Sequence, residues 1–407
     1  MDFDVIIIGA GAAGMFAAVN SAQLDMKTAV IEPNEKVGRK LAITGKGRCN
    51  LTNNCDCDTV MKNVPRNPRF LYSALSMCSP SDVMDFFEGE GVALKTERGN
   101  RVFPVSDKAY DIVDALFFKM KRLGVTLLRE RVEEILTDEG RAVGVRTNRG
   151  AHRAAKIILA TGGLSYPVTG STGDGYRMAE QLGHTVTPLK PSLVPLETAE
   201  DCSRMMGLSL KNVVLTVRDS EKNKEIFREQ GEMLFTHFGL SGPLVLSASS
   251  RMDEIREGRY NAHIDLKPAL SEEQLDSRIL RDFSERKNMQ LDNSLRKLLP
   301  EKIILPLLEK CGISPEKQCN SVTREERRRL LENIKNFTLS VTAYRPIAEA
   351  IITAGGISLK EINPKTMESK LVQNLYFAGE IIDTDGYTGG FNLQIAFSTA
   401  FCASVNL

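Results

Sequence analysis

The segment from Val5 to Glu32 constrains the fold most, because it reads as strand, glycine-rich turn, helix and second strand. Its glycines fall at Gly9, Gly11 and Gly14, in the spacing G-x-G-x-x-G. In such a turn the first glycine permits the tight bend, the second admits a pyrophosphate, and the third lets helix and strand pack closely. Glu32 follows Gly9 by 23 residues, near the offset of about 20 expected for a carboxylate on a ribose hydroxyl. The pattern predicts a dinucleotide site; the alternative is a glycine-rich turn that binds no ligand.

The same region could be misread as a membrane segment, because Val5 to Val19 is an uninterrupted run of small and apolar residues. The run is shorter than the roughly 20 residues that span a bilayer. Asp2 and Asp4 precede it, where a signal peptide would carry basic residues. The eight cysteines are scattered without a C-x-x-C pair, so neither a disulfide framework nor a metal site is predicted. We therefore expect a cytoplasmic protein without a membrane partner.

The amino-acid composition argues against a nucleic-acid partner. The chain has 407 residues, enough for two or three domains, and 42% of them are hydrophobic. The formal net charge is only +1, so no overall field attracts nucleic acid. Tryptophan is absent and 6% of residues are aromatic, which leaves little to stack on bases. We expect a small-molecule substrate and no nucleic-acid partner.

Glycine-rich segments follow two later strands. Lys156 to Ala160 reads as a buried strand that ends in Thr161-Gly162-Gly163, and a loop opening a helix near Gly175 comes next. Leu375 to Ala378 is another apolar strand, and Gly379-Glu380 follows it. Strands that end in glycines present their backbone to a ligand at the carboxyl edge of a sheet. Residues 37–53 are rich in glycine, lysine, arginine and asparagine, which favours a loop with donors for an anion.

The middle of the chain has a different character. From Leu193 to Leu266 the apolar period is close to two, which indicates a β-rich unit such as a small barrel. From Ser271 to Asn336 the spacing is helical, and we expect three helices there; Ile357 to Ile362 reads as a strand. The predicted fold class is therefore α/β, a Rossmann-like domain interrupted by an inserted barrel-like unit and a small helical unit. The expected boundaries are 1–190 with 343–407, 191–268 with 336–342, and 269–335.

Several motifs together resemble a known flavoprotein family. The N-terminal motif, ATGG at 160–163 and FAGE at 377–380 resemble the glutathione-reductase-like FAD superfamily. The segments VGRKLAITGKGRCNLTN, TGSTGDG, THFGLSGP, TMESK and GGFNLQIA are similar to those of the YhiN-type flavoproteins. That family includes aminoacetone-oxidase-like enzymes and bile-acid reductases that act on steroid enones. One departure is Thr44-Gly45-Lys46, where the family often has Ser-Gly-Gly.

The resemblance implies FAD as cofactor and a set of contacts to it. On the adenosine and phosphate side these are Gly9, Gly11, Ala12, Ala13, Gly14, Glu32, Arg39, Lys40, Val132, Thr161, Gly162 and Asp174. On the ribityl and flavin side they are Gly45, Gly47, Arg48, Cys49, Asn50, Gly379, Glu380, Gly390, Phe391, Asn392 and Leu393. The helix that begins near Gly390 would point its positive end at the negative charge of reduced flavin. Cys49 is interpreted as a packed small residue rather than a redox thiol.

The sequence favours an FAD-dependent oxidoreductase that reduces an activated C=C bond of an enone-type molecule. No second G-x-G-x-x-G follows a strand, so NADH or NADPH would act as a transient co-substrate without its own domain. Tyr166 and His237 are the candidate proton donors, although Tyr166 could simply pack before Pro167 and His237 could cap a helix. One alternative is an amine oxidase that uses oxygen. Others are a nucleic-acid-binding protein and a protein whose flavin has no catalytic role.

Overall fold

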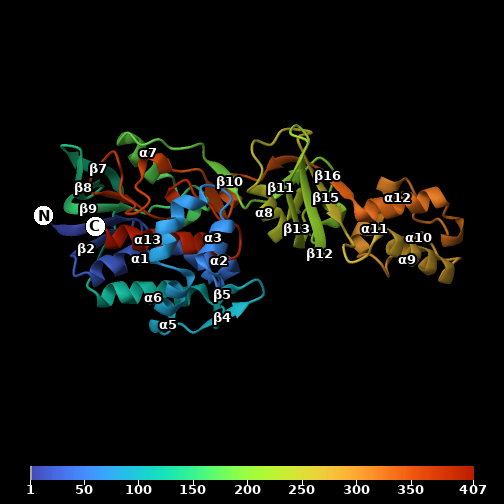
Figure 1. The fold of residues 1–407 in the computed structure, drawn as a ribbon, viewed down its shortest axis with the longest axis horizontal. Coiled ribbons are helices and arrows are strands. Elements are labelled where there is room, and N and C mark those ends of the chain that lie inside the picture. Colours follow the sequence, from blue (N-terminus) through green and yellow to red (C-terminus); the bar gives the residue numbers. More distant parts are fainter. Residues whose placement is uncertain (1) are drawn as a thin grey trace. The chain divides into compact units, whose positions relative to one another are not determined.

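The computed structural model describes residues 2–407, which form two compact units (Figure 1). Unit 1 contains the chain up to Ser192 together with Ile347–Leu407, and unit 2 contains Leu193–Pro346. Unit 2 is therefore an insertion between two parts of unit 1. The chain leaves unit 1 through strand β10 and returns through strand β17, which pair antiparallel with Ser192 opposite Ile352.

Unit 1 is built on a seven-stranded sheet in the order β6-β2-β1-β9-β8-β7, with β18 beside β9. Strands β6, β2, β1, β9 and β18 run parallel. Val5 to Ile8 of β1 are all buried, as expected for a parallel strand covered on both faces. The strands are β1 (Phe3–Ile8), β2 (Thr28–Ile31), β6 (Thr126–Leu128), β7 (Val132–Asp138), β8 (Arg141–Thr147), β9 (Gly150–Leu159) and β18 (Leu375–Phe377).

Helices and two small sheets complete unit 1. The first and last helices, α1 and α13, pack together through Phe16 and Phe397, whose ring centroids are 5.1 Å apart. The helices are α1 (Ala12–Gln23), α2 (Arg39–Gly47), α3 (Cys57–Lys62), α4 (Tyr72–Met77), α5 (Pro80–Gly89), α6 (Ala109–Arg122), α7 (Asp174–Gln181) and α13 (Phe391–Val405). The small sheets contain β3 (Thr52–Asn53), β4 (Leu94–Glu97) and β5 (Arg101–Pro104), and β10 (Lys190–Ser192) with β17 (Ile352–Ala354).

Unit 2 combines a closed barrel with helices on one hydrophobic core. The barrel order is β11-β14-β13-β12-β15-β16, and β11 pairs with β16 to close it. Barrel residues such as Leu215 share a core with helix residues such as Leu275 and Leu307. The strands are β11 (Leu196–Thr198), β12 (Ser209–Asp219), β13 (Lys224–Phe235), β14 (Gly239–Ser241), β15 (Tyr260–Asp265) and β16 (Phe337–Tyr344). The helices are α8 (Pro243–Ser249), α9 (Glu272–Glu285), α10 (Leu291–Leu295), α11 (Glu301–Cys311) and α12 (Arg324–Lys335).

This architecture confirms the predicted fold class, but several local predictions were wrong. Residues 357–362 form no strand; Ile357 makes isolated bridges, and Leu359–Glu361 is a short 3-10 turn. The region from Ser271 to Asn336 holds four helices rather than three, because Leu291–Leu295 forms a single extra turn. Within the predicted loop, Arg39–Gly47 is helical at first and leaves helical geometry at Thr44 to Lys46. Across residues 2–407, no helix is both long and apolar enough to cross a bilayer.

A buried histidine holds together two loops of unit 1 that are distant in sequence. His184 is 3% exposed, and its Nδ1 lies 3.2 Å from Glu361 Oε2. Its Nε2 lies 2.9 Å from Ser369 Oγ, in the TMESK segment. Ser369 Oγ already accepts the backbone N–H groups of Leu371 and Val372, so its hydroxyl must donate to Nε2. The imidazole is therefore the neutral Nδ1–H tautomer, and a second ring proton would find no acceptor.

This arrangement predicts a loss of stability in acid. Burial lowers the pKa of His184 below its ordinary value of 6.5, although the neighbouring Glu361 partly offsets the effect. Below about pH 6.5 the unfolded chain therefore binds a proton at His184 that the folded chain does not bind. The free energy of unfolding falls as pH drops through this range, by at most about 1.4 kcal/mol per pH unit. Thermal unfolding between about pH 5 and 8 should show a shallower decline for His184→Gln. His237→Gln, which removes an exposed imidazole, is the control; equal slopes in all three proteins would contradict the assignment.

Candidate functional site

Three glycines at the end of β1 have three different environments. Gly9 has φ +101°, and a Cβ there would lie 2.7 Å from the carbonyl oxygen of Ala160. A Cβ on Gly14 would overlap the carbonyl oxygen of Gly9, so this glycine sets the spacing between helix and strand. A Cβ on Gly11 would meet no atom within 4 Å. The backbone at Gly11 therefore borders open space, where a ligand can approach the N-terminus of α1.

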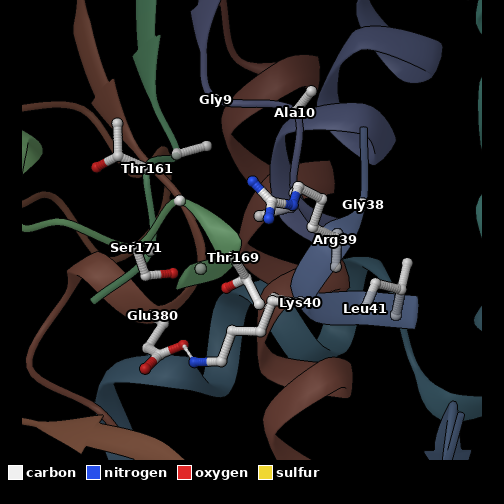
Figure 2. Close-up of a pocket in the computed structure, with 18 of the residues that line it drawn as sticks. Gly9, Ala10, Gly38, Arg39, Lys40, Leu41, Thr161, Thr169, Ser171 and Glu380 are labelled. Carbon is white, nitrogen blue, oxygen red and sulfur yellow. Dashed lines mark hydrogen bonds and ion pairs between the residues drawn. The ribbon is translucent and has the colours of Figure 1, made fainter. Parts of the chain in front are cut away.

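A cavity begins at this turn and continues along the carboxyl edge of the sheet (Figure 2). It is lined by Gly9, Ala10, Gly11, Ala12, Ala13, Glu32, Asn34, Lys36, Gly38, Arg39, Lys40, Leu41, Thr44, Ala160, Thr161, Gly162, Thr169, Gly170, Ser171, Ile351, Ile352, Ala378, Gly379, Glu380, Thr384, Asn392, Leu393, Ile395 and Ala396. A second cavity adjoins it at Gly9, Glu32, Thr161 and Gly170, and adds Val132 and Asp174. Together they form an elongated site of the kind that a dinucleotide requires.

The carboxylate at the end of β2 is fixed by backbone donors. Glu32 is 9% exposed, and its Oε2 accepts the N–H of Ala10 at 2.9 Å. Its Oε1 accepts the backbone N–H of Asn34 at 2.9 Å and the side-chain amide of Asn34 at 2.6 Å. Arg39 donates to the amide oxygen of Asn34 at 2.7 Å. A carboxylate and a cation therefore stand side by side where ribose and phosphate groups would need partners.

A second carboxylate closes the other end of the cavity. Lys40 Nζ lies 2.6 Å from Glu380 Oε2 and 2.6 Å from Ser165 Oγ. Glu380 Oε1 accepts the hydroxyl of Ser165 at 2.9 Å and the backbone N–H of Thr353 at 2.8 Å. These residues come from four separate segments of the chain. They are drawn together because each carboxylate oxygen is satisfied by donors of another segment.

The start of α13 is held by side chains that bond to its preceding loop. Asn392 accepts the N–H of Gly386 at 2.7 Å and donates to the carbonyl of Gly386 at 2.7 Å. Gly390 has φ +99°, and a Cβ there would overlap the backbone of Thr52. Asn392 and Leu393 then line the cavity with the first turn of the helix. The positive end of the helix dipole is thus available to a ligand with negative charge.

Two residues that line the cavity have buried hydroxyls without a partner in the described structure. The Oγ1 atoms of Thr161 and Thr384 are buried and have no hydrogen-bond partner among the described residues. Buried polar groups without partners are rare in native proteins, and ligands are one way to satisfy them. The open backbone at Gly11, by contrast, borders the cavity and matches the phosphates of a dinucleotide cofactor.

The family model described as HI0933-like protein Rossmann domain matches residues 3–406. The chain belongs to this family. It is an FAD-dependent oxidoreductase, as the sequence motifs indicated.

Two of the curated relatives match over nearly their full length. The chain is 32% identical to the ribosomal RNA dihydrouridine synthase of Escherichia coli, covering 100% of this chain and 98% of that protein. It is 28% identical to the 3-dehydro-bile acid delta(4,6)-reductase of Clostridium scindens, covering 98% of this chain and 97% of that protein. Among solved structures, 3-ketosteroid delta1-dehydrogenase from Sterolibacterium denitrificans aligns with a TM-score of 0.53 at 13% identity, covering 99% and 98% of the two chains. That likeness supports the fold alone.

Many of the residues predicted to bind the cofactor line these cavities. In the first cavity they are Gly9, Gly11, Ala12, Ala13, Glu32, Arg39, Lys40, Thr161, Gly162, Gly379, Glu380, Asn392 and Leu393. Val132 and Asp174 line the second cavity, and Asp174 accepts a hydrogen bond from Arg131 at 2.7 Å. The contacts of these residues with FAD stay predictions, but the residues lie together around two adjoining cavities.

Other predicted residues lie outside both linings in the described structure: Gly14, Gly45, Gly47, Arg48, Cys49, Asn50, Gly390 and Phe391. Arg48 is bound to the carboxylates of Glu97 and Asp107 and covers the ring of Phe103 at 4.2 Å. Cys49 is fully buried, and burial raises the pKa of its thiol to about 12, so it is protonated at neutral pH. Neither side chain lines either of the two described cavities.

Neither of the two candidate proton donors, Tyr166 and His237, lines either described cavity. The carbonyl of Tyr166 accepts the N–H and the hydroxyl of Thr169 at 2.8 and 2.7 Å, so this residue shapes the loop beside the cavity. His237 is exposed in unit 2, with its ring edge-on to Phe238 at 5.0 Å. Their roles in proton transfer stay predictions.

The sequence prediction missed several lining residues. Thr169, Gly170 and Ser171 belong to the TGSTGDG loop, of which only Asp174 was assigned to the cofactor. Asn34 and Thr384 were missed because no motif marks a side chain whose position depends on a loop. Ile352 enters the lining as the first residue of β17, a short strand that pairs with β10, and Ile351 directly precedes that strand. Only the fold brings that strand to the cavity.

Proposed function

We propose that this protein uses NADH or NADPH to reduce a carbon–carbon double bond conjugated to a carbonyl group. One observation carries the proposal: two full-length relatives have names that describe this same bond change on different molecules. Dihydrouridine is uridine whose ring double bond, conjugated to a carbonyl, has gained two hydrogen atoms. A 3-dehydro bile acid with a delta-4 double bond is an enone. The shared chemistry is conjugate reduction.

The atoms balance with one nicotinamide and one proton. NAD(P)H gives up a hydride and leaves as NAD(P)⁺; the β carbon of the substrate receives a hydride, and the α carbon receives a proton. FAD would carry the two electrons between them. Hydride transfer is favoured in a site from which water is excluded. The apolar side chains of Leu41, Ile351 and Leu393 in the cavity wall would help to exclude it.

The residues of the cavity would hold the cofactor from both ends. The open backbone at Gly11 and the cation of Arg39 suit the pyrophosphate, and Glu32 suits the adenosine ribose. The first turn of α13 would stabilise negative charge on the reduced ring.

For the substrate, we favour a uracil base in ribosomal RNA. The supporting observation is that relatives named for this activity in Escherichia coli and Haemophilus influenzae share 32% and 31% identity over nearly the whole chain. The sequence-based prediction of no nucleic-acid partner is not confirmed. A small enone such as a steroid is the second candidate, supported by the Clostridium scindens relative at 28% identity.

An anaerobic titration tests the reaction. The purified yellow protein is mixed separately with NADH and NADPH, and either one should bleach the flavin absorbance. Unmodified ribosomal RNA should then restore the colour and gain dihydrouridine, seen by mass spectrometry of its nucleosides as two added hydrogen atoms. A 3-oxo-delta-4 steroid is the parallel acceptor, and turnover of the steroid alone would select the second candidate. If neither nicotinamide bleaches the flavin but an amine does, with peroxide formed in air, the protein is an oxidase instead.

A further inference from the structure

We propose that the ion pair of Lys40 and Glu380 is a charge-balanced element that sets the reduction potential of the bound flavin. The inference rests on FAD binding in this cavity but not on the identity of the substrate. It assigns Lys40 a role different from the ribose or phosphate contact that the sequence implied, because the structure directs its ammonium to a carboxylate.

The pair is part of a closed hydrogen-bond ring. Lys40 donates to Glu380 Oε2 and to Ser165 Oγ, both at 2.6 Å, and Ser165 donates to Glu380 Oε1 at 2.9 Å. The backbone N–H of Thr353 donates to the same Oε1 at 2.8 Å. Thr353 Oγ1 in turn accepts the N–H groups of Leu164 and Ser165, at 2.8 and 3.1 Å. These hydrogen bonds therefore hold the side chains of Lys40 and Glu380 in one conformation.

The pair lies in the cavity wall and keeps capacity for a ligand. The side chains of Lys40 and Glu380 are only 23% and 15% exposed, and both residues line the cavity. Among the described residues Lys40 uses two of its three N–H donors, and Glu380 accepts three of about four possible hydrogen bonds. A bound cofactor can therefore contact either group while the pair stays neutral overall.

The neighbouring cation provides a contrast. Figure 2 shows that the side chains of Arg39 and Lys40 diverge: the guanidinium turns toward the side of the cavity where Gly9 lies, and the ammonium turns toward Glu380. Arg39 is bound to the amide of Asn34, which contacts Glu32 at the adenosine end. Two adjacent residues of equal charge therefore serve opposite ends of one site.

The electrostatic consequence has a definite sign. Reduction places negative charge on the flavin, so a nearby cation favours the reduced form and a nearby anion favours the oxidised form. Removing Lys40 leaves the carboxylate of Glu380 uncompensated and should lower the potential. Neutralising Glu380 leaves the ammonium uncompensated and should raise it. Because each charge is only partly exposed, solvent screens neither change fully.

The experiment is an anaerobic redox titration against reference dyes at saturating FAD. We expect Lys40→Met to shift the ratio of reduced to oxidised flavin at least about tenfold toward oxidised, which is about 30 mV for a two-electron couple. Glu380→Gln should shift it by a similar factor toward reduced. The double variant should return close to the wild-type potential, and Lys40→Arg should retain it. Arg39→Met, the matched control, should weaken binding of both redox forms without changing their ratio.

Each result has a defined meaning. Shifts of Lys40→Met and Glu380→Gln in the same direction, or potentials unchanged in both, would overturn the proposal. If both single variants bind no FAD, recovery of binding in the double variant supports charge pairing, and no recovery contradicts it. Opposite shifts in a protein that reduces no conjugated double bond would leave the ion-pair inference standing and refute the proposed function alone.

Discussion

Replacement of Gly11 by valine should yield a folded protein that carries no flavin. The backbone at Gly11 has φ −81° and ψ −168°, which valine adopts readily, and a Cβ there meets no protein atom within 4 Å. The added isopropyl group would instead fill the space beside the N-terminus of α1. Loss of two charge-assisted hydrogen bonds at about 1.5–3 kcal/mol each corresponds to about 10²- to 10⁴-fold weaker binding.

The measurement compares flavin content and thermal unfolding in the same preparation. The visible absorbance of the purified variant should vanish, while the unfolding free energy of the apo form stays within about 0.5 kcal/mol of wild-type apoprotein. Gly11→Ala is the graded control, because a single methyl group obstructs the phosphate less. A Gly11→Val protein that retains stoichiometric FAD would refute the assignment of the pyrophosphate to this turn.

Gly14→Ala should have the opposite phenotype and destabilise the domain itself. Alanine ordinarily improves a helix interior by about 1 kcal/mol relative to glycine. Here the new Cβ would overlap the carbonyl oxygen of Gly9 and lie 3.0 Å from its carbonyl carbon, and rigid backbone cannot move aside. Overpacking costs about 1–3 kcal/mol and sometimes more, so the steric term outweighs propensity. We expect a net loss of about 2 kcal/mol, or roughly 4–8 °C in melting temperature.

Thermal unfolding of the apoprotein checks this prediction without interference from the cofactor. Gly11→Ala again serves as control, since it adds the same methyl group to the same turn in open space. The apoprotein of Gly14→Ala should melt earlier than that of Gly11→Ala. Equal melting temperatures would show that helix α1 can move away from β1, and that Gly14 is not required for their packing.

The sequence predicted those parts of the site that depend on backbone geometry near one strand. Gly9 and Gly11 follow directly after a buried strand, and Glu32 follows the next one, so local order was enough to place them in the cavity lining. Parallel strands also bring their carboxyl ends to one edge, which is why Thr161 and Gly379 were found. In each case a residue's position is fixed by the strand immediately before it.

The sequence could not predict the partners of side chains across long separations. Lys40 was expected to meet ribose or phosphate, which stays a prediction; its protein partner Glu380, 340 positions away, was not foreseen, because the contact depends on how α2 is placed against the segment after β18. The contact of Arg48 with the flavin stays a prediction, and its ion pairs with Glu97 and Asp107 were not foreseen because those residues are distant in sequence. The prediction of a strand from Ile357 to Ile362 was wrong. In this segment Ile357 and Ile362 form only isolated β-bridges, so no continuous ladder of backbone hydrogen bonds makes a strand. In each of these segments the local structure depends on contacts with residues that are distant in sequence.

The pairing of β10 with β17 has a consequence for how such a protein can evolve. Ser192 and Ile352 lie opposite each other, so the chain leaves and re-enters the core of unit 1, before and after residues 193–346, at neighbouring points of one small sheet. Antiparallel strands can be joined by a turn of two residues, so the core fold of unit 1 does not depend on the length or content of what lies between them. A change in the length of the inserted segment therefore leaves the strand order of unit 1 unaltered.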